Sequence, residues 1–233
     1  MADPAIALAY YAVFLVSTTL HEAAHAWAAK LGGDLTAYHG GQVSLDPRPH
    51  IKREPFGMVV LPLLSALISG WPFGFASAPY DPRWAMRHPT RAAWMALAGP
   101  GANLLLLLVA AVAIRAGMAA GVFHAPDVVR FGSIVDAEGE GLWRGLGFLL
   151  GVVFSMNLVL ATLNLIPVPP LDGSAAVPLF LSPEAGGRYQ QFLWSQPMLG
   201  WFGMLVAWRL FDVLFRPLFL LAISLLYPGM RYS

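Results

Sequence analysis

The sequence predicts an all-α membrane protein, a polytopic helical bundle of four to six transmembrane helices with a small β-hairpin after the first helix. Of its 233 residues, 58% are hydrophobic and only 12% are charged, about half the charged fraction of a soluble domain. Two uncharged segments, 92–114 and 145–171, could each cross a hydrocarbon core of about 30 Å as a helix. No long polar stretch remains for a soluble module, so residues 1–233 are expected to form a single membrane domain.

Net charge and cysteine content exclude several classes of partner and site. The formal charge is +1, which gives no indication of nucleic acid binding. The chain has no cysteine, so disulfides and thiolate metal ligands are excluded. Its start lacks the basic region of a signal peptide, and we therefore expect the first apolar segment to be retained.

The first span is expected at about residues 4–31, where Gly32 and Gly33 resemble a helix C-cap. Polar residues follow to position 54. Two short segments, 35–38 and 42–45, flank Gly40-Gly41, a pattern that predicts a hairpin turn. The run Asp46-Pro47-Arg48-Pro49 is then expected to break regular structure.

The second apolar segment, about 56–71, contains Pro62 and could either span the bilayer or enter and return. Three later segments are also apolar enough to span: 92–115, 143–166 and 197–227. The last contains charged residues and a proline, so it could form one kinked helix or two short ones. Residues 72–91, 116–142 and 182–196 are expected to be interfacial or exposed connections.

Charge placement indicates an orientation. Lys30, Arg48, Lys52 and Arg53 follow the first span, whereas Asp3 is the only charged side chain before it. The positive-inside rule therefore places the N-terminus outside and the 32–55 loop in the cytoplasm.

The first span carries an HExxH motif, His21-Glu22-Ala23-Ala24-His25. Positions i and i+4 share one face of a helix, so both imidazoles can reach the same ion. Zinc suits imidazole ligands, and Glu22 is placed to contact a metal-bound water as a general base. Glu22 precedes Lys30 by about 12 Å along a helix. Ionisable groups at such a depth are costly and usually functional, although a structural histidine pair is the alternative.

Asp172 is the best candidate for the third metal ligand. It follows a span and a proline-rich break, whereas most other acidic residues lie in loops or near helix ends. Its position before Gly173 also fits a helix N-cap, and on its own this residue would favour the cap. The need of the histidine pair for a third ligand favours the metal.

Taken together, three segments resemble the site-2 protease family of intramembrane zinc metalloproteases. They are the HExxH motif, the Gly99-Pro100-Gly101-Ala102-Asn103 segment, and residues 164–173, which run from Asn164 through Pro167 to Asp172-Gly173. The resemblance covers about residues 15–180, so the chain looks like a minimal core member of the family.

The resemblance implies a role for each matching residue. His21, His25 and Asp172 would hold one Zn²⁺ per chain, and Glu22 would act as general base and acid. Asn164 would lie near the metal and stabilise the oxyanion or hold the substrate. Alternatively, Asn164 would satisfy backbone groups opened by Pro167. The Gly99–Asn103 segment is expected to pack helices closely, with a structural role for Asn103.

The resemblance also implies an activity, a substrate and a location. The enzyme would cut a peptide bond within or next to a transmembrane segment of a membrane-anchored protein, and the 34–48 hairpin would receive the substrate as an added strand. A multi-pass protein of the bacterial inner membrane is expected, in contact with the lipid bilayer. Two alternatives remain: a membrane metal-ion transporter, and a non-catalytic relative that binds membrane proteins.

Overall fold

The computed structural model describes residues 3–139, 141–196, 198–230 and 232. The described helices are α1 (Pro4–Gly32), α2 (Thr36–His39), α3 (Pro47–Arg53), α4 (Leu61–Ser69), α5 (Pro82–Arg87), α6 (Pro89–Ala119), α7 (Leu142–Asn164), α8 (Asp172–Ala175), α9 (Pro183–Ser195) and α10 (Met198–Leu226). A π-helical turn, η1 (Phe56–Val60), leads into α4, and a 3₁₀ turn, η2 (Val177–Phe180), follows α8. The strands are β1 (Phe123–His124) and β2 (Asp136–Ala137).

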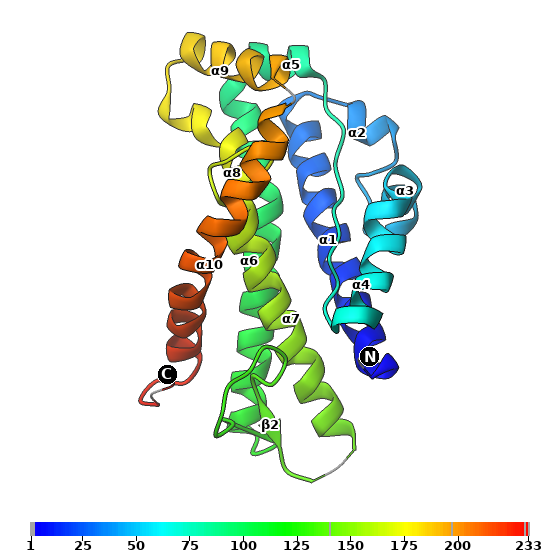
Figure 1. Cartoon of the computed structure of the whole chain (residues 1–233), viewed down its shortest axis with the longest axis vertical. Helices are drawn as coiled ribbons and strands as arrows, with labels where there is room; N and C mark the ends of the chain where they lie inside the picture. Colours follow the sequence, from blue (N-terminus) through cyan, green and yellow to red (C-terminus); the bar gives the residue numbers. More distant parts are fainter. Residues whose placement is uncertain (1–2, 140, 197, 231, 233) are drawn as a thin grey trace.

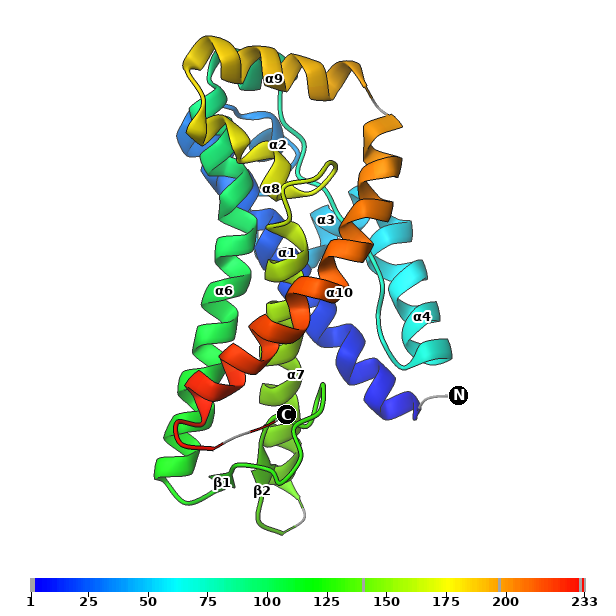
Figure 2. The ribbon, with the colours of Figure 1, turned by 60° about the vertical axis from the view of Figure 1, so that its left-hand side comes forward.

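Helices α1, α6 and α7 form the centre of the molecule, with α6 packed against both α1 and α7 (Figure 1). Helices α5 and α9 lie across one end of this bundle, while β1 and β2 lie near the other end (Figure 2). Within the described part of the chain, α1, α6 and α7 are long and apolar enough to cross a membrane. The mostly helical architecture is therefore confirmed, with three candidate spans of this kind and a shorter apolar helix at 56–69 among the described residues. The expected number of four to six transmembrane helices stays a prediction.

Helix α1 begins and ends as the sequence predicts. The Asp3 carboxylate accepts a hydrogen bond from Ala5 N at 2.8 Å, and Pro4 occupies the first helical position. Gly33 adopts the left-handed conformation (φ 95°) and its N–H bonds back to the Ala29 and Lys30 carbonyls. The C-terminal 29-residue segment also forms one continuous helix, α10, which runs through Pro217.

The expected β-hairpin after the first helix is wrong. The described residues 34–48 contain no strand and instead form α2 and the start of α3. Asp34 explains the difference, because its Oδ1 accepts from Thr36 N at 2.9 Å and Thr36 Oγ1 at 2.6 Å, which starts a helical turn. The small two-stranded antiparallel sheet instead pairs Phe123 with Ala137 in the α6–α7 connection.

Three segments expected to be loops or breaks begin helices. Proline follows a capping residue at Asp46-Pro47, Asp81-Pro82 and Ser182-Pro183, and these pairs start α3, α5 and α9. Each capping side chain accepts from a backbone N–H two or three residues later, at 3.0, 2.8 and 3.3 Å respectively. Proline at the first helical position loses no hydrogen bond, so a pattern that resembles a chain break here marks a helix start.

We predict that Asp34→Ala destabilises the protein more than Asp46→Ala. Asp34 is 5% exposed and bonds both its own turn and, at 2.8 Å, Asp81 N at the start of α5. Asp46 is an exposed cap whose side chain, among the described residues, contacts only Arg48 of its own helix. We expect losses of about 2–3 kcal/mol and about 1 kcal/mol, measured by unfolding in detergent. Equal losses would show that the bond between Asp34 and α5 adds nothing to stability.

Candidate metal centre

Three predicted ligands meet at one point. His21 Nε2 and His25 Nε2 are 2.9 Å apart, and Asp172 Oδ2 lies 3.1 Å from the first and 3.3 Å from the second. Both histidines are 6% exposed. Ligand atoms at 2.0–2.2 Å from a tetrahedral zinc ion are separated by about 3.3 Å. The three side chains therefore form a group that could hold a metal ion, and their spacing fits zinc.

Local structure explains how Asp172 reaches the histidines. After α7 ends at Asn164, the chain turns back, and α8 begins at Asp172 itself. The preceding residue, Leu171, makes no side-chain capping bond. A Cβ on Gly173 would lie 2.6 Å from Ile166 O, so glycine allows α8 to pack onto the end of α7. The Asp172 carboxylate faces the histidines rather than capping a helix.

The second nitrogen of each imidazole is also bonded. His25 Nδ1 lies 2.8 Å from Met95 O, and His21 Nδ1 lies 2.6 Å from Asn103 Oδ1, both on α6. A backbone carbonyl only accepts, so His25 Nδ1 carries the proton and leaves the Nε2 lone pair free. Outer partners of this kind fix the tautomer and orientation of metal-binding histidines.

Gly99 allows α6 to approach the histidines closely. A Cβ at this position would lie 2.6 Å from His21 Nε2 and closer still to His25 Nε2. Because Met95, Gly99 and Asn103 are spaced four residues apart, they share one face of α6. This face packs against the histidine face of α1. Met95 contributes its carbonyl, Asn103 its side-chain amide, and Gly99 leaves space for the imidazoles.

Glu22 is buried beside the ligand group. It is 5% exposed, and its Oε2 has no hydrogen-bond partner in the described part of the chain. Buried polar atoms are normally paired, so an unpaired carboxylate oxygen next to two imidazoles calls for a functional explanation.

The structure places Asn164 at the end of α7, where its Nδ2 donates to the Leu160 carbonyl on the same helix at 3.0 Å. The expected alternative was a bond of this type to backbone. The role of Asn164 at the oxyanion stays a prediction.

Tyr80 lies at the end of the extended segment before α5, and its ring packs edge-on against Trp194 with 5.7 Å between centroids. Burial raises the pKa of the Tyr80 phenol, and the negative charge of Asp172 raises it further. The phenol is therefore held neutral within electrostatic reach of the ligand group.

Sequence reasoning missed two contributors to the centre. Asn103 was expected to be structural, whereas its side chain contacts a ligand histidine. Its spacing from Gly99, the same i to i+4 step as in the HExxH motif, was the available signal. The Met95 carbonyl gave no signal, because any residue supplies the same backbone group.

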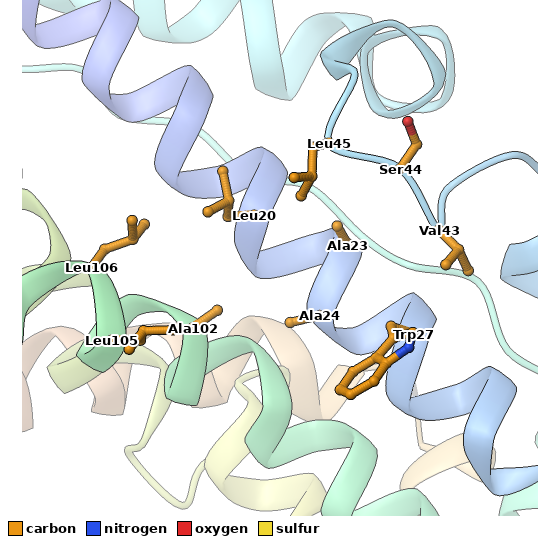
Figure 3. Close-up of a pocket in the computed structure, with 10 residues that line it drawn as sticks. All are labelled: Leu20, Ala23, Ala24, Trp27, Val43, Ser44, Leu45, Ala102, Leu105 and Leu106. Carbon is orange, nitrogen blue, oxygen red and sulfur yellow. The ribbon is translucent and has the colours of Figure 1, made fainter. Parts of the chain in front are cut away.

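An apolar groove of about 350 Å³ lies between α1, α6 and the 43–45 segment (Figure 3). Its lining consists of Leu20, Ala23, Ala24, Trp27, Val43, Ser44, Leu45, Ala102, Leu105 and Leu106. None of the three ligands lines it, and neither does Glu22. The groove is therefore a hydrocarbon-like surface beside the centre and not the centre itself.

A histidine pair and a neighbouring glutamate on a helix of membrane-spanning length, with the Asp172 carboxylate of α8 beside the pair, are typical of a metallopeptidase centre. The model of peptidase family M50 matches residues 9–193. The chain belongs to this family and is a zinc metalloprotease. The predicted site-2 protease family is thereby confirmed.

Two similar proteins carry the same description. The chain is 34% identical to "Putative zinc metalloprotease Rip2" of Mycobacterium tuberculosis over 225 aligned residues, which cover 88% of this chain and 76% of that protein. It is 30% identical to "Putative zinc metalloprotease YwhC" of Bacillus subtilis, over 76% of this chain and 71% of that protein. No solved structure matches the chain significantly.

We predict that Gly99→Ala weakens zinc binding at least about tenfold, a loss typical of disturbed metal surroundings. The new methyl group would displace both ligand imidazoles. Gly101→Ala is the matched control, because a Cβ there meets nothing within 4 Å. Zinc affinity, measured by competition with a chelator in detergent, should fall only in the first variant. Unchanged affinity in Gly99→Ala would show that the close approach of α6 is not required.

Proposed function

We propose that this protein cleaves a peptide bond within or next to a transmembrane segment of a membrane-anchored protein. A zinc ion held by His21, His25 and Asp172 would serve the reaction. The observation that carries the proposal is the position of the two histidines beside Asp172. They are buried on α1, one of three helices of membrane-spanning length in the described part of the chain.

The depth of the group favours a membrane substrate. Glu22 lies ten residues before the C-terminal end of α1, or about 15 Å at 1.5 Å per residue. A peptide bond that reaches this depth must belong to a chain already in the bilayer. The apolar surface around α1 suits such a substrate, and the bacterial origin of the relatives supports a location in the cell membrane.

The residues divide the chemistry among them. His21 and His25 would bind through Nε2, and Asp172 through its carboxylate. Zinc, when bound, supplies Lewis acidity and lowers the pKa of a coordinated water to about 7. Glu22 would take a proton from the attacking water and pass it to the leaving amine. Its unpaired buried oxygen supports this role, because no structural bond occupies it among the described residues.

The other functions receive less support. A metal-ion transporter needs polar groups in series across the membrane, whereas the ligands here converge on one point beside a glutamate. A non-catalytic relative would lack Glu22 or a ligand, and this chain has all of them. The expected docking of substrate on a 34–48 hairpin is withdrawn, because these residues form no strand.

We predict that Glu22→Gln retains zinc and loses cleavage. Glutamine keeps the shape of the side chain but cannot accept the proton, and loss of such a base typically costs about 10²–10⁴-fold in rate. The measurement combines zinc content with cleavage of a transmembrane substrate by the purified protein. Glu54→Gln is the control, since Glu54 lies outside the ligand group and bonds Ser77. Full cleavage by Glu22→Gln would overturn the assignment of the base.

We predict that Asp172→Ala lowers both zinc content and cleavage, because two imidazoles alone bind zinc weakly. A chelator should likewise abolish cleavage by the wild type, and added zinc should restore it. Zinc held at the wild-type level by Asp172→Ala would remove Asp172 from the ligand set. A wild-type protein that binds no metal would overturn the proposed function.

A further inference from the structure

A line of buried amides leads away from the metal centre through the middle of the bundle. Asn103 Nδ2 on α6 donates to Asn157 Oδ1 on α7 at 2.9 Å. Asn157 Nδ2 donates in turn to Ser17 Oγ on α1 at 3.0 Å and to Val153 O at 2.8 Å. Asn103 and Asn157 are fully buried, and Ser17 is 2% exposed. The line therefore joins all three membrane-length helices.

The direction of every bond in this line is set at Val153. Its carbonyl can only accept, so the amide nitrogen of Asn157 must face it. Asn157 Oδ1 then faces Asn103, and Asn103 must present its own nitrogen to Asn157. Asn103 Oδ1 is left facing His21, whose Nδ1 must carry the proton. The Nε2 lone pair of His21 is thereby directed at the other two ligands.

The alternative arrangement is unfavourable at each step. A flipped Asn157 would place its oxygen against the Val153 carbonyl, so that two acceptors would meet without a proton between them. A flipped Asn103 would break its bond to Asn157 and leave a buried amide oxygen without a donor. Unpaired polar groups are costly in a low-dielectric interior. The line therefore favours the tautomer of His21 that carries its proton on Nδ1 and turns its Nε2 lone pair toward the metal position.

We propose that Asn157 is a positioning residue for the metal centre, which fixes the tautomer of His21 through Asn103 and so raises zinc affinity. The proposal rests on the proposed metal site and adds to it a residue that contacts no ligand. It also explains why α6 and α7 each bury an asparagine where an apolar pair would pack more easily.

The test is a double-mutant cycle on zinc affinity in the full-length protein. Asn103→Leu, Asn157→Leu and the double variant are compared with the wild type by chelator competition in detergent. We expect Asn157→Leu to weaken zinc binding about tenfold, and Asn103→Leu by about 10–100-fold. The double variant should match Asn103→Leu, because Asn157 acts only through Asn103. Losses that multiply, or an unchanged affinity in Asn157→Leu, would overturn the proposal.

Ser155→Ala is the matched control, since Ser155 is fully buried on the same helix and its Oγ has no hydrogen-bond partner among the described residues. Its zinc affinity should stay at the wild-type value. A loss equal to that of Asn157→Leu would show a general disturbance of α7 and overturn the proposal.

Asn157→Asp provides a rescue that a purely structural role would not predict. A buried neutral acid can donate to Val153 and accept from Asn103, so zinc affinity should remain within about threefold of the wild type. Asn157→Ala is made as well, so that the cycle does not depend on folding of the leucine variant. If only Asn157→Asp folds, a loss as large as that of Asn103→Leu would overturn the proposal.

Failure of this inference and failure of the proposed function give different results. A wild-type protein without zinc overturns both. A wild-type protein that binds zinc and cleaves, with an unchanged Asn157→Leu affinity, overturns the inference alone. A protein that binds zinc and follows the cycle but cuts no membrane substrate supports the inference and contradicts the proposed function.

Discussion

The close approach of α6 to α1 at Gly99 is the constraint on which the centre depends. A single methyl group there would overlap both ligand imidazoles, so the geometry requires a residue without a side chain. Once the helices are this close, Met95 and Asn103 come within bonding distance of the two Nδ1 atoms. This one helix contact therefore leaves space for the two imidazoles, orients them and sets their tautomers. The contact between α1 and α6 that packs the bundle therefore also positions the side chains of the candidate metal site.

Burial sets the second constraint, because hydrogen bonds offset the cost of placing polar groups at this depth. The histidines, Asn103 and Asn157 meet this condition through bonds among α1, α6 and α7. Glu22 Oε2 has no such bond within the described part of the chain. The bundle thus pairs the groups around the histidines and leaves unpaired the Glu22 oxygen that the proposed reaction would use. Glu22 is therefore buried, although its Oε2 accepts no hydrogen bond from the described residues.

The sequence was sufficient for the long apolar helices and for the histidine pair. Long uncharged runs predicted α1, α6 and α7, since an apolar run in hydrocarbon has few options other than a helix. The HExxH spacing predicted the histidine pair, because positions i and i+4 share one face of a helix. The hairpin failed because Gly40-Gly41 was weighed without Asp34, whose carboxylate starts a helical turn. Asp46-Pro47 predicted a break in regular structure, although the same residue pair serves equally well as a helix start.

What the sequence could not supply are relations between helices distant along the chain. Asn103 and Asn157 are 54 positions apart, and Asn157 and Ser17 are 140 apart. Nothing in the local pattern distinguishes such an asparagine from one whose amide bonds its own helix, as the Asn164 Nδ2 does with the Leu160 carbonyl. The two cases differ in where the hydrogen bonds lead. The Val153 carbonyl fixes the orientation of the Asn157 amide, and this amide in turn fixes the orientation of Asn103 beside His21. The role of a buried asparagine in a membrane helix is therefore best inferred from the residues to which its chain of hydrogen bonds leads.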